Sequence, residues 1–196
     1  MEGAIVETTL VEALSRIPRA LFLPAGERSH AGDDVPLPIG LGQTNSQPST
    51  VADMLELLDP QPGERILDLG SGSGWTTALL GSRVGEHGNV IGVERHEELI
   101  RRSREALTDH GVENARIEAA TPGRLGLPES GPFDRILVSA GAETLPTELI
   151  EQLRVWGVMV IPVAGEMLRI VRTGTRGDEY ASTKHGRYRF VPLIRD

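Results

Sequence analysis

The sequence predicts an α/β fold with a doubly wound, mostly parallel sheet and antiparallel strands at its C-terminal edge. Three observations support this prediction. Beyond residue 64, short apolar runs alternate with amphipathic runs, a pattern typical of parallel strands joined by crossover helices. One of these apolar runs ends in a glycine-rich turn that leads straight into a helical pattern. After residue 163 the helical patterns stop, and the remaining runs are typical of antiparallel edge strands.

Length and composition indicate a single domain, because the chain has 196 residues. Its 20 Lys and Arg oppose 28 Asp and Glu, which gives a formal net charge of −8. This balance argues against a nucleic-acid partner, since binding phosphates takes a clustered basic face. The absence of cysteine excludes disulfides, thiolate metal sites and cysteine nucleophiles. The five histidines are scattered along the chain, so we assign them no role and expect no metal site.

The beginning of the chain carries no targeting signal that we can identify. Glu2, Glu7 and Glu12 lie in the first 14 residues, which contain no basic segment. No stretch of the sequence approaches the ~18 apolar residues that a membrane span requires. We therefore expect a cytoplasmic protein with no membrane partner, and a monomer.

The first 58 residues predict a helical cap with a long loop. Apolar residues at helical spacing between Thr8 and Leu21, interrupted by Pro18, indicate two short helices. From Pro24 to Pro48 the chain is too rich in proline and glycine for a long element, and loops of this length are usually functional. A helix is expected from Ser49 to Leu58.

Residues 64–196 predict the α/β core. The expected elements, in order, are strand Ile66–Leu69, helix Trp75–Val84, strand Val90–Val93, helix Glu97–His110, strand Ala115–Ala119, strand Phe133–Ser139, helix Pro146–Leu153 and strand Val158–Val163. Two antiparallel edge strands, Met167–Arg172 and Tyr188–Leu193, are expected to follow.

The strongest local signal is the glycine turn after the first core strand. It reads Asp68-Leu69-Gly70-Ser71-Gly72-Ser73-Gly74. Glycines remove Cβ atoms that would hold a ligand away from the backbone, and the helix that follows offers unpaired N–H groups. A dinucleotide turn would need a glycine where Trp75 stands, and no Gly-Lys-Ser/Thr follows for a P-loop.

The turn resembles the G-x-G-x-G motif of class I S-adenosylmethionine-dependent methyltransferases, which share a Rossmann-like fold. Glu94, 26 residues after Asp68, ends the next expected strand. Asp68 can help to hold the cofactor's ammonium group, and the Glu94 carboxylate suits the two hydroxyls of its ribose. This resemblance assigns cofactor binding to Asp68, Gly70, Ser71, Gly72, Ser73 and Glu94. From the residues alone, a ligand-free connection at the turn and a solvated helix start at Glu94 remain alternatives.

A second resemblance covers nearly the whole chain. The segment Leu37-Pro38-Ile39-Gly40-Leu41-Gly42-Gln43-Thr44-Asn45-Ser46-Gln47-Pro48 resembles the signature of protein-L-isoaspartate O-methyltransferases. It continues through the glycine turn to the ending Arg189-Phe190-Val191-Pro192-Leu193. It implies an enzyme that moves a methyl group from S-adenosylmethionine to the carboxylate of L-isoaspartyl residues in damaged proteins, after which the ester collapses to a succinimide and repair follows.

The same resemblance suggests roles for two segments. Ser46 corresponds to the family's serine that hydrogen-bonds the acceptor carboxylate, which makes it the catalytic candidate; the alternative is an N-cap for the helix that begins near Pro48. The segment Phe190–Leu193 would lie beside the substrate peptide, or else form a plain edge strand. Residues 1–58 would then supply the helical cap and the substrate and cofactor loop, and residues 64–196 the cofactor-binding core.

Four positions depart from the family pattern. In the segment Thr121-Pro122, Pro122 stands where the family has an aspartate that holds the adenine amino group, and Gly32, Ser49 and Trp156 are also changed. Two alternatives therefore stay open. One is a related O-methyltransferase that acts on an aspartate of a dedicated peptide or on another acceptor. The other is a non-catalytic homologue that binds S-adenosylmethionine or a peptide.

Overall fold

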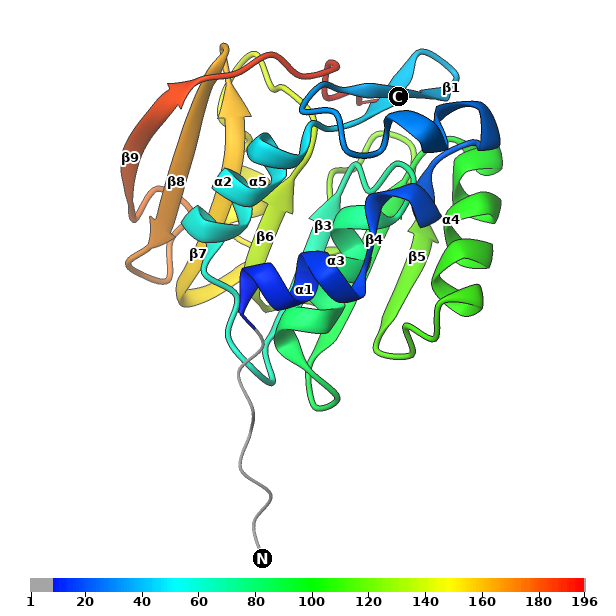
Figure 1. The fold of residues 1–196 in the computed structure, drawn as a ribbon. Coiled ribbons are helices and arrows are strands. Elements are labelled where there is room, and N and C mark those ends of the chain that lie inside the picture. The colour runs from blue at the N-terminus through cyan, green and yellow to red at the C-terminus, as the bar shows by residue number, and fades with distance from the viewer. Residues whose placement is uncertain (1–8, 196) are drawn as a thin grey trace, which may run out of the picture.

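The predicted fold class is confirmed by a computed structural model that describes residues 9–195 (Figure 1). Glu2, Glu7 and Thr8, the first residue of the expected N-terminal helix, lie outside the described residues. The helices and 3-10 helices are α1 (Leu10–Arg16), η1 (Arg19–Phe22), η2 (Ala25–His30), α2 (Pro48–Leu58), α3 (Trp75–Val84), α4 (Glu97–Asp109), η3 (Pro128–Ser130) and α5 (Thr147–Ile150). The strands are β1 (Leu37–Gly40), β2 (Gln43–Asn45), β3 (Arg65–Leu69), β4 (Asn89–Glu94), β5 (Ala115–Ala119), β6 (Phe133–Val138), β7 (Leu153–Val163), β8 (Glu166–Arg172) and β9 (Tyr180–Arg187).

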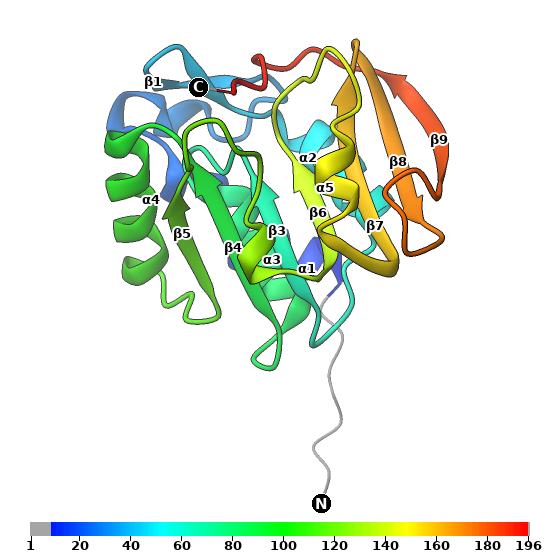
Figure 2. The ribbon, with the colours of Figure 1, turned by 180° about the vertical axis from the view of Figure 1, so that it is seen from behind.

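Seven of these strands form one sheet in the order β5-β4-β3-β6-β7-β8-β9. The strands from β5 to β7 pair in parallel, whereas β8 pairs antiparallel with both β7 and β9. Apolar residues of α2, α3 and α4 form a core with one face of the sheet, and those of α5 form a second core with the opposite face (Figures 1 and 2). The strand order reverses at β3, so the carboxyl ends of β3, β4 and β6 meet where α/β folds bind ligands.

The prediction of the second edge strand, Tyr188–Leu193, is wrong. The chain pairs with β8 through Tyr180–Arg187, and not through Tyr188–Leu193. The real edge strand is mostly exposed and polar, so it lacks the apolar alternation that reveals a strand. The segment Tyr188–Leu193 instead crosses the carboxyl ends of the sheet, where the Gly141 N–H donates to the Val191 carbonyl and the Leu193 N–H to the Gly141 carbonyl (both 2.8 Å).

Two further elements differ from expectation. The helix expected over Pro146–Leu153 is only the single turn α5, because buried Leu153 already begins β7 and continues the same apolar run. The loop Pro24–Pro48 contains η2 and the antiparallel hairpin β1–β2. The hairpin turns at Leu41, which lies between two glycines and has a φ of 55° itself.

Candidate active site

The glycine turn is fastened to the neighbouring strand. The N–H groups of Gly70 and Ser71 both donate to the Val93 carbonyl of β4, at 2.9 and 3.1 Å. Gly72 and Gly74 have φ angles of 53° and 85°, where L side chains are strained. Protein atoms occupy the space beside these two glycines where a Cβ would lie. This corrects the interpretation from sequence, in which the missing Cβ atoms make room for a ligand. A Cβ at Gly74 would lie 3.0 Å from Ser103 of α4, and one at Gly72 would lie 3.2 Å from Ile39 of β1.

Glu94 lies at the end of β4, so it is not a solvated helix start. Its side chain is 6% exposed. One carboxylate oxygen accepts from the Gly72 N–H at 3.0 Å, and the other accepts from the N–H groups of Arg95 and His96 at 2.8 and 2.9 Å. A carboxylate offers about four acceptor positions, so this arrangement leaves room for a further donor while fixing the orientation of the group.

Asp68 lies beneath the turn and is fully buried. Its Oδ2 accepts from the Thr77 hydroxyl at 2.6 Å, whereas its Oδ1 and the Ser71 hydroxyl have no hydrogen-bond partner among the described residues. Burial, opposed by the Thr77 hydrogen bond and assisted by the charge of nearby Glu94, raises the pKa of Asp68 to about 7. The Asp68 carboxylate is thus a buried acid beneath the turn with one oxygen left to be satisfied.

A cavity of about 170 Å³ opens above the turn, and we call it the turn cavity. Gly70, Gly72 and Glu94 of the predicted site line it, whereas Asp68, Ser71 and Ser73 do not. Its remaining lining comes from four places: the hairpin (Gln43, Thr44), strand ends (Leu69, Val93, Arg95, His96, Ser139, Ala140), the loop after β5 (Ala120, Thr121, Pro122, Arg124, Leu125) and the C-terminal segment (Val191, Pro192, Leu193, Ile194).

Ser46 lines a small cavity of about 50 Å³ next to the turn cavity, and we call it the Ser46 cavity. Thr44, Ser139 and Val191 belong to the walls of both cavities. The N-cap of α2 is Gln47, with no side-chain capping bond, so the N-cap alternative for Ser46 is wrong. Within residues 9–195 the Ser46 hydroxyl has no hydrogen-bond partner, so it is available to a ligand in the cavity.

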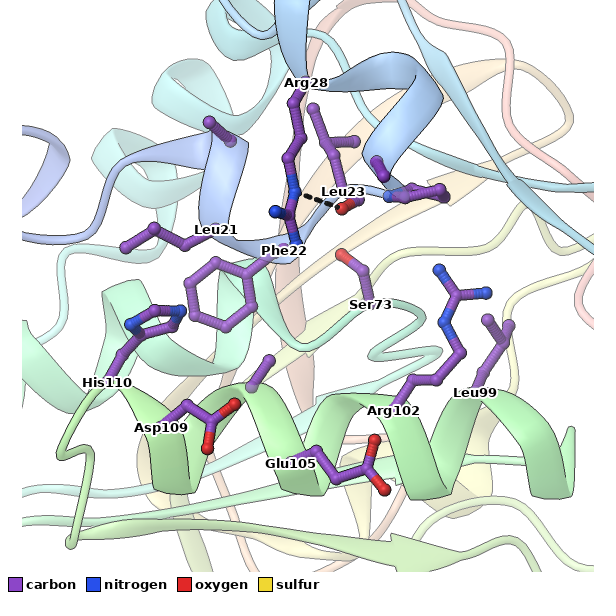
Figure 3. A pocket seen from close by; sticks show the side chains of 14 residues that line it. Leu21, Phe22, Leu23, Arg28, Ser73, Leu99, Arg102, Glu105, Asp109 and His110 are labelled. Atoms are coloured by element: carbon purple, nitrogen blue, oxygen red, sulfur yellow. Dashed lines mark hydrogen bonds between the residues drawn. The ribbon is translucent and has the colours of Figure 1, made fainter.

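A larger cavity of about 430 Å³ lies elsewhere, between α4 and the segment of η1 and η2 (Figure 3). Only Ser73 of the predicted site lines it, with Phe22, Arg28 and Arg102 among its neighbours there. Size alone therefore does not locate the site. We place it at the turn cavity, because the turn backbone and the Glu94 carboxylate meet there.

Sequence reasoning missed two residues of this region. Ser139, a polar residue directly after the apolar strand β6, lines both cavities. Arg189 lines the Ser46 cavity. The rule that strand ends at the reversal of strand order bind ligands could have found Ser139. By contrast, Gly32, Ser49 and Trp156 line neither cavity, and Trp156 lies at the irregular start of β7, 63% exposed.

Two further kinds of feature are absent from the part of the chain that the structure describes. No helix in residues 9–195 is long and apolar enough to cross a membrane. Across the same residues, no group of three or more His, Asp or Glu side chains is arranged to hold a metal ion.

The fold and the glycine turn together define a class I S-adenosylmethionine-dependent methyltransferase. A family model described as "Protein-L-isoaspartate(D-aspartate) O-methyltransferase" matches residues 1–196. The chain belongs to the protein-L-isoaspartate O-methyltransferase family, and the resemblance seen in the sequence is confirmed.

Individual relatives agree with this assignment. The chain is 42% identical to a protein-L-isoaspartate O-methyltransferase of Aeropyrum pernix, over 98% of this chain and 75% of the relative. It is also 42% identical to that of Flavobacterium psychrophilum, over 100% of this chain and 90% of the relative. A Plasmodium falciparum protein of this kind, solved in complex with S-adenosyl-L-homocysteine, superimposes with a TM-score of 0.83 at 26% identity, over 98% and 93% of the two chains.

Proposed function

We propose that this protein transfers the methyl group of S-adenosylmethionine to the free carboxylate of L-isoaspartyl residues in damaged proteins. One observation carries the proposal beyond family membership. The turn cavity and the Ser46 cavity share Thr44, Ser139 and Val191 as common walls. A cofactor above the turn and an acceptor beside Ser46 would therefore be neighbours, as a direct transfer requires.

The residues at the turn fit the cofactor. S-adenosylmethionine supplies a methyl group activated on a sulfonium. Gly70 and Gly72 would meet it with backbone, and the oriented Glu94 carboxylate would accept from a ribose hydroxyl at its remaining acceptor position. Ser71 and Ser73 belong to the same turn. Asp68 would act from beneath it, because an ammonium bound above favours the ionised form of that buried acid.

The acceptor side needs alignment more than acid–base chemistry. A carboxylate is already ionised near pH 7, so no general base has to remove a proton. The Ser46 hydroxyl would donate to one carboxylate oxygen and leave the other facing the methyl group. Arg189, in the same small cavity, would add a positive charge beside the acceptor.

A methyl-transfer assay tests this proposal. Labelled S-adenosylmethionine is supplied with an isoaspartyl peptide or with the same peptide containing a normal aspartyl residue. Transfer to the isoaspartyl peptide alone supports repair methylation. Transfer only to another acceptor favours a related O-methyltransferase, and cofactor binding without any transfer favours a non-catalytic homologue. Either of the last two results overturns the proposal.

The remaining expectations belong to the same proposal. In it, the whole chain acts as one domain, with residues 1–58 as cap and loop and residues 64–196 as the cofactor-binding core. The protein would act on isoaspartyl proteins as a monomer in the cytoplasm. Light scattering during size-exclusion chromatography tests the oligomeric state, and cell fractionation tests the location.

A further inference from the structure

Arg19 of η1 is a buried hub of hydrogen bonds, with only 5% of the residue exposed. Its Nε donates to the Asn45 Oδ1 at 2.8 Å, and its Nη2 donates to the carbonyls of Val35 and Asn45 at 2.8 and 3.0 Å. Its Nη1 donates to the carbonyls of Asp33 and Ala31 at 3.0 and 3.5 Å. Since a guanidinium has five N–H donors, every one of them is used.

All the acceptors of Arg19 are neutral oxygens, and within residues 9–195 no carboxylate pairs with it. Burial lowers the pKa of Arg19, opposed by the nearby charges of Asp34 and Asp33, and a guanidinium still remains charged. Burying a charge without a contacting counterion has a desolvation cost, which here only the hydrogen bonds of the guanidinium offset. Its fork of five donors instead defines the geometry of the loop and the hairpin strand β2, which a lysine with three donors could not do.

Asn45 extends this hub to the glycine turn. While its Oδ1 accepts from Arg19, its Nδ2 donates to the Ser73 hydroxyl at 2.9 Å. Asn45 is 5% exposed and directly precedes Ser46 in the chain. Arg19 also lies over the ring of Trp75, the first residue of α3, at 5.7 Å from the ring centre. A continuous polar connection therefore runs from the residue beside Ser46 to the turn.

We infer that Arg19 and Asn45 are positioning residues that hold Ser46 at a fixed place relative to the glycine turn. This inference rests on the proposed function, because it assigns Ser46 to the acceptor and the turn to the cofactor. Transfer of a methyl group in line needs both partners aligned to within about an ångström. Asn45 provides that alignment although it lines neither the turn cavity nor the Ser46 cavity.

Three variants test the connection. Ser73→Ala removes only the bond between Asn45 and the turn, and Asn45→Ala removes the bonds of its amide to both Arg19 and Ser73. We expect each to lower kcat on an isoaspartyl peptide by about tenfold, while the Kd for S-adenosyl-L-homocysteine and the KM for the peptide stay within about threefold. Asn45→Asp should recover most of the rate, because its second oxygen can accept from the Ser73 hydroxyl.

The double variant and a control complete the test. Ser73→Ala combined with Asn45→Ala should be no slower than Asn45→Ala alone, since both break one connection. Arg28→Ala, which removes an exposed arginine of η2, should leave kcat unchanged. Thermal unfolding establishes that the compared proteins are folded, and Ser73→Ala keeps the test valid if Asn45→Ala does not fold.

The two possible failures are distinguishable. If the unchanged protein does not methylate the isoaspartyl peptide, the proposed function fails. If it does, and either Ser73→Ala and Asn45→Ala retain full kcat or their loss is entirely in cofactor affinity, the positioning role is overturned while the function stands.

Discussion

The floor and the roof of the turn cavity are built differently. The floor consists of strand ends and the glycine turn, with Glu94 held by three backbone N–H groups. The roof consists of the hairpin β1–β2 with the adjoining Ser46, and of residues 188–195. Arg19 and Asn45 hold the hairpin end beside Ser46, whereas residues 188–195 are anchored at the surface, with the Tyr188 hydroxyl donating to Asp53 (2.8 Å) and Arg195 pairing with Glu148 (2.6 Å).

This contrast matches two different tasks. A floor fixed by the sheet suits a cofactor that is the same in every turnover, because the donors and acceptors of the floor are preorganised. The roof carries exposed apolar residues such as Leu41 and Ile194, which are 50% and 42% exposed. It also supplies Ser46 and Arg189 to the small cavity. We therefore expect changes in the floor to alter cofactor binding and changes in the roof to alter turnover of the peptide.

The largest effect is expected in the roof, at Ser46. Ser46→Ala should lower kcat on an isoaspartyl peptide on the order of a hundredfold, because the acceptor carboxylate loses its orientation. Cofactor affinity should stay within a few-fold, and the melting temperature should not change, since Ser46 does not cap α2. Steady-state kinetics and thermal unfolding measure these quantities, with Ser29→Ala as the exposed control. A fully active Ser46→Ala protein would remove the catalytic assignment.

The matching change in the floor is at Glu94. Glu94→Ala should weaken binding of S-adenosyl-L-homocysteine by roughly 10- to 100-fold, because a charge-assisted hydrogen bond to the ribose is lost. Titration calorimetry gives the Kd, and His87→Ala, whose side chain is 72% exposed, is the control. Unchanged affinity in Glu94→Ala would mean that the cofactor does not bind on this floor.

The third prediction concerns Asp68, the buried carboxyl group beneath the floor of the turn cavity. Burial raises its pKa from 3.8 to about 7, so between these values the folded protein keeps a proton that the unfolded chain has released. The free energy of unfolding contributed by this group therefore falls as pH rises from about 4 to about 7. Asp68→Asn removes this titration. The free energy of unfolding of the variant, relative to that of the wild type, should therefore increase from about pH 4 to about pH 7 and then level off. Urea unfolding at several pH values, without cofactor and with Asp109→Asn as control, measures it. A pH-independent difference would contradict the assignment.

The smallest effect is expected at Pro122, which lines the turn cavity where the family has its adenine-binding aspartate. Pro122→Asp should tighten cofactor binding by a factor of about two to twelve, the value of one hydrogen bond to a neutral amine. Peptide preference should not change. Weaker binding in calorimetry would show that another group already satisfies the adenine amine.

Sequence reasoning succeeded where one segment dictates its own structure. The β3–turn–α3 unit was predictable because apolar residues, glycines and the helix follow one another in the chain. Tyr188–Leu193 was mistaken for a strand because its neighbours, the carbonyl groups of Gly141 and Gly165, are distant in sequence. For the same reason, no local sequence pattern indicates that Asn45 donates a hydrogen bond to Ser73, or that Ser139 lines both the turn cavity and the Ser46 cavity.

The two tryptophans give the molecule a built-in optical probe. Trp75 is 3% exposed, its indole N–H donates to the Ile17 carbonyl at 2.9 Å, and the Arg19 guanidinium lies over its ring. Trp156 is largely in water at the start of β7, so its emission lies at longer wavelength. In a Trp156→Phe protein the remaining fluorescence comes from the residue that begins α3. The emission wavelength of Trp75, and the quenching of its fluorescence by the Arg19 guanidinium, would then report any movement between η1 and α3 in real time.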